Sequence, residues 1–465
     1  MRDWTVSELA QDFKEGRISR RHFIVRMLSV GLTAPVIAGV LAACGSSTSN
    51  NTNKAGTTSA GSAGTTAVGT AASGSATAST SAKDTFQPAK RGGGGTLKLL
   101  WWQGPTTLNA HISTGTKDFD GSRIFTEPLA AWDADSNLFP ILAAEIPSIE
   151  KGTVAKDGTS VTWKLKQGVQ WHDGQPFNAD DVVFTFQYVT DPATASTSVG
   201  VYKNVGSVEK VDDATVKVTF KEPTPYWQGV FTAGYGHIFP KHLLEQYKGA
   251  NARNSPFNLK PVGTGAYKVI DFKPGDSITA EINQNYHVPN RPFFDRIELK
   301  GGGDATSAAR AVLQTGDYDY AWNLQVTDDI LKELEKTGQG KVVIYPGGSS
   351  EHVQLNPTDP NTEVDGEKSS LKSKHPFLSD PAVRKAFTFL FDRKTLAEQL
   401  YGRTGAAATY YLYNPKKYVP DSPSTWEFNL QKGGQMLDDA GWKKGSDGVR
   451  AKNGVKMKAL FQTSV

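Results

Sequence analysis

The segment Gly168–Phe186, GVQWHDGQPFNADDVVFTF, brings four groups that can do chemistry close together in the sequence. His172 can exchange protons near neutral pH or bind a metal, and carboxylates follow at Asp173, Asp180 and Asp181. Imidazole and carboxylate groups are common metal ligands and common acid–base catalysts. Both roles require the four side chains to converge on one point, so the elements that carry them decide between chemistry and structure.

A helix that begins after Asn178 accounts for two of these carboxylates. Asn178 is a favourable N-cap, because its side-chain oxygen can accept a hydrogen bond from a free backbone amide of the first turn. Asp181 occupies the capping-box position, and both Asp180 and Asp181 lie at the positive end of the helix dipole. The residues ahead of the helix form a turn in which Gly174 can adopt positive φ. A turn followed by a cap does not make side chains converge, so we predict no metal site, no cofactor and no catalytic residue here.

The N-terminus carries signals for export. A pair at Arg20 and Arg21 resembles a twin-arginine motif, and a mostly apolar run, Met27–Ala43, follows it. The run lacks the length and flanks of a comfortable membrane span. It leads into the letters LAAC, which resemble a bacterial lipoprotein box and imply cleavage before Cys44 and a diacylglycerol thioether on its sulfur. We predict an export signal over residues 1–43, and either the twin-arginine or the general route is compatible with it.

The segment after the export signal has the composition of a flexible tether. Cys44 is the single cysteine of the chain, so no internal disulfide and no cysteine nucleophile are expected in the exported protein. Residues 44–91 are dominated by Ser, Thr, Gly and Ala, which cannot bury enough surface to offset the entropy of ordering. We predict a lipidated cysteine and a disordered tether that hold a globular body on the outer face of the membrane or in the periplasm.

The body from Gly92 onward is close to electrically neutral. The chain of 465 residues has a formal net charge of +4, but ten Lys and Arg against five Asp and Glu lie in residues 1–91. The remainder therefore carries a net charge of −1. Nucleic acid binding requires a basic face, so we expect no nucleic acid partner. The length suffices for two or three domains with substantial cores.

Short helices and strands alternate along the body, which predicts a mixed α/β fold without a solenoid repeat. Alternating side chains predict strands over Thr96–Trp102, Ser160–Lys166, Thr215–Phe220, Ser277–Ile282, Lys341–Tyr345 and Glu351–Leu355. Caps and helical spacing predict helices from Asn178, over Thr306–Leu313, from Asp380 and from Lys394 to Gly402.

The body resembles the extracytoplasmic solute-binding proteins of bacterial ABC importers, in the peptide-binding group of oligopeptide- and dipeptide-binding proteins (solute-binding family 5). The opening segment looks like the signature of this group, with a structural role for Trp171, Asp173, Gly174, Asn178, Asp180 and Asp181. Further blocks follow in family order at Phe239–His242, Val262–Tyr267, Asn285-Tyr286, Arg291–Asp295, Asn356, Pro376-Phe377, Asp380, Val383-Arg384, Phe391–Arg393 and Ala440–Trp442. The ordered set extends from about Gly92 to Val465.

The resemblance implies a two-lobe α/β fold like that of periplasmic binding proteins, with an extra subdomain in the near lobe. By this likeness, the near lobe consists of residues 92–125 and 255–350, and the inserted subdomain of residues 126–254. Residues 351–465 begin the far lobe. Members of the group continue well past Lys456–Phe461, so we interpret the far lobe as incomplete at the C-terminus and the chain as a fragment. The acidic residue with which many peptide binders hold the ligand's amino terminus would lie beyond Val465.

The resemblance also implies a function and partners. Two lobes would close on a peptide or other small solute and present it to the permease subunits of an ABC transporter, with the protein a monomer held to the membrane by its lipid. Aromatic side chains provide large, rigid contact areas for such a solute. The candidates for the ligand-binding wall are Trp101, Trp102, Tyr235, Trp322 and His352.

Other functions remain open at this point. A sensor or chaperone could use the same fold, and paired tryptophans suit an oligosaccharide as well as a peptide. Eight scattered histidines argue against nickel. An exported hydrolase is disfavoured, because Gly347–Glu351 lacks the closing glycine of a nucleophile elbow and neither a His-Glu-x-x-His motif nor a phosphate loop is present. We therefore expect a binding protein and not an enzyme.

Overall fold

The computed structural model describes residues 11–12, 86–133, 135–345, 347, 350–408, 411, 416–420 and 426–462. The arginine pair at Arg20 and Arg21, the predicted lipidation site Cys44 and the predicted tether up to residue 85 lie outside these residues. The chain divides into two compact units, Ser79–Tyr345 and Pro346–Val465 with the N-terminal Met1–Ala78. We call the described parts of Ser79–Tyr345 and Pro346–Val465 the first and the second unit. In the described residues, no helix is both long and apolar enough to span a membrane.

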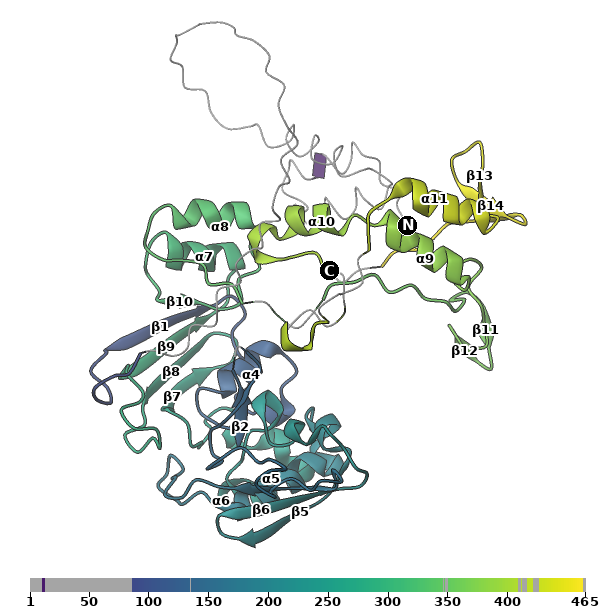
Figure 1. The fold of residues 1–465 in the computed structure, drawn as a ribbon. Coiled ribbons are helices and arrows are strands. Elements are labelled where there is room, and N and C mark those ends of the chain that lie inside the picture. Colours follow the sequence, from purple (N-terminus) through teal and green to yellow (C-terminus); the bar gives the residue numbers. More distant parts are fainter. Residues whose placement is uncertain are drawn as a thin grey trace, which may run out of the picture. The chain divides into compact units, whose positions relative to one another are not determined.

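The first unit contains a five-stranded sheet with the order β10-β1-β9-β8-β7 (Figure 1). Its strands are β1 (Thr96–Trp101), β7 (Tyr267–Lys273), β8 (Ser277–Ile282), β9 (Arg296–Gly301) and β10 (Tyr320–Ala321). β1 pairs in parallel with both β9 and β10, whereas β7, β8 and β9 form an antiparallel meander. The parallel strands therefore end at one common edge, where β1 ends at Trp101 and Trp102 follows it.

Two helices accompany this sheet. α7 (Ala305–Leu313) and α8 (Asp328–Glu335) pack on each other through Ala309, Leu313, Leu331 and Leu334. α7 also contacts β10.

A second layer of the first unit is built on the sheet β4-β6-β5. It comprises β4 (Ser160–Lys164), β5 (Val205–Asp212) and β6 (Thr215–Phe220), with α5 (Ala179–Thr190) packed against β5 and β6. The shorter elements are α4 (Thr116–Ser122), β2 (Ala130–Trp132), β3 (Leu138–Pro140) and α6 (Lys241–Leu244). The core of this layer is aromatic, with Trp163, Trp171, Tyr188 and Phe239 almost completely buried.

The second unit is smaller, and its longest regular elements are helices. It contains α9 (Pro381–Leu390), α10 (Arg393–Leu400) and α11 (Leu430–Asp439), with the short strands β11 (Glu363–Val364), β12 (Glu367–Lys368), β13 (Lys443–Lys444), β14 (Arg450–Lys452) and β15 (Val455–Lys456). Phe377, Val383, Leu437 and Trp442 form its core between α9 and α11.

Most local predictions are confirmed, and two strands are wrong. β6 and β8 have the predicted bounds, Asn178 caps α5, and Asp380 caps α9 with Pro381 in its first turn. Residues 341–345 and 351–355 are not strands in the structure. Their alternating apolar side chains are largely exposed, since Val343, Tyr345 and Val353 are 56%, 58% and 44% accessible. An alternating pattern of apolar side chains predicts which face of a strand would be buried. It does not provide the neighbouring strand that the backbone hydrogen bonds require.

The boundary of the tether also changes. The prediction placed residues 86–91 in the tether, but in the structure they belong to the body. Phe86 packs edge-on against Phe293 at 5.2 Å. The Arg91 guanidinium donates to the carbonyl oxygens of Arg291 at 2.5 Å and Val288 at 3.0 Å. A guanidinium held by several carbonyls orders a segment whose composition alone predicts disorder.

Candidate functional site

The four polar groups of the opening segment do not converge. His172 Nδ1 accepts from the Gly263 amide at 3.1 Å, so its Nε2 carries the proton and donates to the Gly265 carbonyl at 3.0 Å. Burial lowers the pKa of His172 to about 4. Asp173 pairs with His242 at 2.8 Å, and Gly174 has φ +89° as the turn requires.

The two aspartates at the start of α5 also have separate partners. Asp180 pairs with Lys210 at 2.6 Å on the surface. Asp181 is buried and accepts from the Asn178 amide at 3.1 Å, the Lys241 amide at 2.9 Å and Trp171 Nε1 at 3.2 Å. Burial raises the pKa of the Asp181 carboxyl. The carboxylate therefore joins the start of α5, the start of α6 and the Trp171 turn.

The glycines of the next family block complete this arrangement, which we call the signature hub (Trp171, His172, Asn178, Asp181, Gly263 and Gly265). A Cβ on Gly263 would lie 1.8 Å from the Phe125 carbonyl oxygen, and one on Gly265 would lie 2.6 Å from it. Only glycine allows this approach, which also permits the Gly265 amide to donate to Phe125 at 2.9 Å. The hub is a structural junction.

The aromatic candidates from the parallel strands lie together at the strand ends. Trp101 closes β1 and stacks on Trp322, which follows β10, with ring centroids 5.0 Å apart and an interplanar angle of 20°. Trp322 Nε1 donates to Asp120 Oδ2 at 2.9 Å, and Trp102 Nε1 donates to the Asn323 carbonyl at 3.0 Å. Trp101 and Trp322 are only 4% and 7% accessible, and the Trp101 indole nitrogen has no hydrogen-bond partner among the residues that the structure describes.

The helix α4 connects these tryptophans with Tyr235. Phe119 packs edge-on against Tyr235, with ring centroids 5.2 Å apart, and the next residue, Asp120, holds Trp322. Tyr235 is 45% accessible. Four of the five predicted ligand residues thus belong to one group, the strand-end cluster (Trp101, Trp102, Phe119, Asp120, Tyr235 and Trp322). Their contact with a ligand stays a prediction.

His352, the fifth candidate, belongs to the second unit. It is exposed, its Nδ1 bonds to the Ser350 carbonyl oxygen at 2.9 Å, and its ring meets Tyr411 edge-on with centroids 6.2 Å apart.

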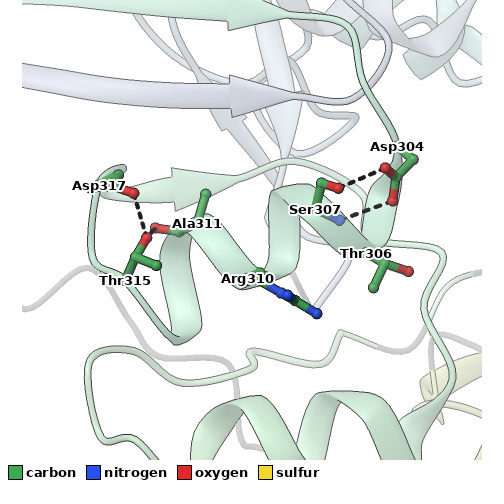
Figure 2. A pocket seen from close by; sticks show the side chains of 7 residues that line it. All are labelled: Asp304, Thr306, Ser307, Arg310, Ala311, Thr315 and Asp317. Atoms are coloured by element: carbon green, nitrogen blue, oxygen red, sulfur yellow. Dashed lines mark hydrogen bonds between the residues drawn. The ribbon is translucent and has the colours of Figure 1, made fainter.

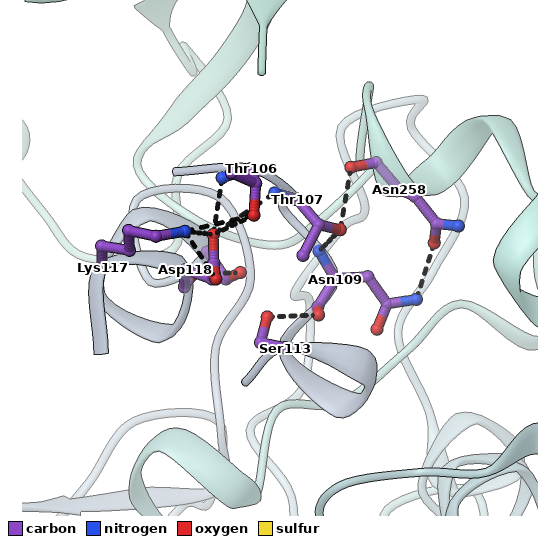
Figure 3. A network of polar contacts seen from close by, with 8 residues as sticks. Thr106, Thr107, Asn109, Ser113, Lys117, Asp118 and Asn258 are labelled. Atoms are coloured by element: carbon purple, nitrogen blue, oxygen red, sulfur yellow. Dashed lines mark hydrogen bonds and ion pairs between the residues drawn. The ribbon is translucent and has the colours of Figure 1, made fainter. Parts of the chain in front are cut away.

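Sequence reasoning missed Phe119 and Asp120. The signal that would have found them is topological: ligands of open α/β sheets bind outside the carboxyl ends of parallel strands, and α4 follows the end of β1. A polar network fixes the approach to α4 (Figure 3). In it the buried Asp118 carboxylate accepts from the Thr106 amide at 2.6 Å and from Lys117 Nζ at 2.9 Å, and Asn109 Nδ2 donates to Asn258 Oδ1 at 2.8 Å. Rigid support of this kind is what a binding side chain needs.

A surface pocket of about 330 Å³ lies along α7 (Figure 2). Asp304 caps this helix by accepting from the Ser307 amide at 2.9 Å and hydroxyl at 2.7 Å, and Thr315 donates to Asp317 at 2.5 Å. These polar groups serve the helix itself, and no aromatic side chain lines the pocket. Among the described residues, no group of three or more His, Cys, Asp and Glu is placed to hold a metal.

Solved structures show the class of fold. The chain is similar to the oligopeptide-binding protein AppA of Bacillus subtilis in complex with a nonapeptide, with 27% identity and a TM-score of 0.56 over 80% of this chain and 68% of that one. It is also similar to NikA of Brucella suis in complex with Fe(III)-EDTA, with 22% identity and a TM-score of 0.60 over 78% and 67%. The chain has the two-lobe α/β fold of periplasmic binding proteins.

Sequence comparison gives the family. Residues 137–465 match the model for bacterial extracellular solute-binding proteins, family 5 Middle, and the chain belongs to this family. Full-chain comparison with AppA of Bacillus subtilis (strain 168) gives 29% identity over 96% of this chain and 72% of the relative. The glutathione-binding protein GsiB of Escherichia coli (strain K12) is 26% identical over 73% of this chain and 60% of its own length.

Proposed function

We propose that this protein captures a peptide between two lobes outside the cytoplasm and delivers it to the permease of an ABC importer. The observation that carries the proposal is the strand-end cluster, in which aromatic rings and one carboxylate gather at the edge where parallel strands end. The likeness to AppA, whose structure contains a nonapeptide, supports a peptide as the ligand. Catalysis has no part in this function.

The binding surface would work through rigid aromatic contacts. The stacked Trp101 and Trp322 form an inflexible base, held by Asp120, and Tyr235 adds an accessible ring with a polar hydroxyl. Such rings bury much area at low entropic cost. A ligand that contacts both lobes favours the closed state by its greater affinity for that state.

The lobe boundaries and the anchor belong to the same proposal. The near lobe would consist of residues 92–125 and 255–350, with 126–254 inserted and 351–465 in the far lobe. Export through residues 1–43 and lipidation of Cys44 would hold the receptor next to its permease. The LAAC motif supports this anchor.

Native mass spectrometry of the full-length protein purified from its host tests the proposed ligand. We expect peptides to co-purify with the protein. Calorimetry with synthetic copies of these peptides should then show binding without turnover. A co-purified oligosaccharide would replace the peptide as ligand. Cleavage of the peptides would overturn the binding function itself.

A further inference from the structure

The turn that carries Tyr235 has a strained backbone. Phe231 and Ala233 have φ values of +60° and +50°, in the left-handed region that residues other than glycine rarely adopt. The chain then folds back so closely that a Cβ on Gly236 would lie 2.0 Å from the Thr232 amide nitrogen. A strained conformation persists only where its surroundings hold it, and such residues are concentrated at binding sites. The turn therefore depends on contacts that other segments supply.

Both ends of this turn are anchored in the core. The Leu129 amide donates to the Phe231 carbonyl at 2.9 Å, and the Ile238 amide donates to the Glu127 carbonyl at 2.9 Å. Phe231 and Ile238 are completely buried. The middle of the turn reaches the surface, since Tyr235 is 45% exposed. The anchors therefore fix where the turn begins and ends, whereas the direction of the Tyr235 ring depends on contacts closer to it.

One buried hydroxyl reaches the backbone of Tyr235 itself. Tyr202 closes the short 3₁₀ helix η3 (Val199–Tyr202) and is 1% accessible, and its Oη donates to the Tyr235 carbonyl oxygen at 3.2 Å. The Tyr202 ring packs edge-on against Phe231, with centroids 5.4 Å apart. The same side chain therefore contacts the strained start of the turn and the residue that the turn exposes. From α4, Phe119 contacts the ring of Tyr235.

We infer that Tyr202 is a positioning residue of the proposed binding site, which holds the turn Phe231–Gly236 so that Tyr235 presents its ring to the solute. The inference rests on the proposed function and adds a residue that acts on the solute only through another side chain. A ring that is already oriented in the empty protein loses less conformational entropy on binding. Without the Tyr202 hydroxyl, the turn would populate more conformations, and the affinity would fall with the fraction that is competent to bind.

A purely structural role of Tyr202 would be to stabilise the core. Tyr202→Phe keeps the ring and its packing and removes only the hydroxyl. Tyr267→Phe is the matched control, because Tyr267 is 8% accessible and also donates to a backbone carbonyl, that of Phe294, at 3.1 Å. It lies in β7, at the edge of the five-stranded sheet away from β10. A structural role predicts the same result for both variants, a small loss of stability with unchanged affinity.

Calorimetry of the full-length protein with a pool of synthetic nonapeptides tests the inference. We expect Tyr202→Phe to bind the pool about fivefold more weakly than the wild type, as for the loss of a neutral hydrogen bond, and Tyr267→Phe to bind it like the wild type. Tyr235→Ala should also bind more weakly. Adding Tyr202→Phe to Tyr235→Ala should weaken binding no further, because the hydroxyl acts through the ring that is already missing. Melting temperatures should show that each variant folds.

Three results would overturn the inference. Wild-type affinity in Tyr202→Phe, with binding weakened in Tyr235→Ala, would show that the hydroxyl does not position the ring, and the proposed function would stand. An equal loss of affinity in Tyr267→Phe, or a loss from Tyr202→Phe that persists in Tyr235→Ala, would assign Tyr202 a general structural role. Failure of the pool to bind the wild type would refute the peptide-binding function and this inference with it.

Discussion

The first unit contains two Trp–Asp pairs of the same chemistry in opposite settings. In the signature hub, Trp171 Nε1 donates to Asp181 at 3.2 Å, and two backbone amides complete the coordination of a carboxylate that is 4% exposed. In the strand-end cluster, Trp322 Nε1 donates to Asp120 at 2.9 Å, but this carboxylate remains 30% exposed with an exchangeable arginine beside it. A fully coordinated carboxylate stabilises the fold, whereas one with free lone pairs is available to a ligand.

The largest effect on stability is expected in the hub, from Gly263→Ala. The new Cβ would lie 1.8 Å from the Phe125 carbonyl oxygen, so the backbone must move and the hydrogen bonds of His172 must break. We expect a loss of about 4 kcal/mol or more in the free energy of unfolding, measured in urea. Gly200→Ala is the control, because nothing lies within 4 Å of its added Cβ. Similar losses of unfolding free energy in Gly263→Ala and Gly200→Ala would contradict the conclusion that the hub is a rigid region.

Acid should weaken the hub through His172. Burial lowers its pKa in the folded protein from the ordinary value of 6.5 to about 4, so the unfolded chain binds more protons between these two pH values. Stability from this group is therefore complete above pH 6.5 and is lost as the pH falls toward 4, by about 3 kcal/mol at 1.36 kcal/mol per pKa unit. His111 and His237 are buried and act in the same direction. Urea unfolding at pH 7.5 and 4.5 gives the change in unfolding free energy between the two pH values. This change should be smaller for His172→Asn than for the wild type, and identical changes would refute the role of His172.

Asp181→Asn tests the hub pair directly. The amide has one acceptor oxygen where the carboxylate serves three donors, so at least one buried N–H loses its partner. We expect a loss of about 2 kcal/mol in stability with unchanged ligand affinity. Asp120→Asn, at a carboxylate that is 30% exposed, should leave stability almost unchanged. Equal losses of stability in the two variants would erase the distinction between the regions.

Asn178→Ala removes only the cap of α5. The Asn178 side chain accepts from the Asp180 amide at 2.8 Å, and its loss should cost about 1 kcal/mol of stability. Thermal unfolding measures the stability of the variant, and calorimetry with the native ligand measures its affinity. A large loss of affinity without a change in melting would place the signature in the binding site.

The smallest effect on stability is expected for Tyr235→Ala. This side chain is 45% exposed, so the unfolding free energy should change by about 0.5 kcal/mol or less, while affinity for the co-purified ligand falls. Tyr226→Ala, at a residue 68% exposed, should leave affinity unchanged. Unchanged affinity in Tyr235→Ala would remove this ring from the proposed site.

The sequence by itself determined the local structure of the hub and of several elements. The cap at Asn178, the positive φ of Gly174 and the start of α9 at Asp380 depend on hydrogen bonds and sterics within a few residues, so the letters sufficed. The ordered motifs also indicated the family whose model matches residues 137–465. The same local rules failed for residues 341–345, because a strand needs a partner that its own side chains do not specify.

Only the tertiary structure decided which groups meet at the strand ends. Asp120 and Trp322 are 202 positions apart, and they come together because β1 pairs in parallel with β10 while α4 follows β1. Trp101 and Trp322 were recognisable as aromatic candidates, but their stacking and their carboxylate were not. Parallel pairing brings distant segments together through backbone hydrogen bonds that carry no sequence signal of their own. The turn and the helix cap of the hub could therefore be derived from the letters, whereas the strand-end cluster could not.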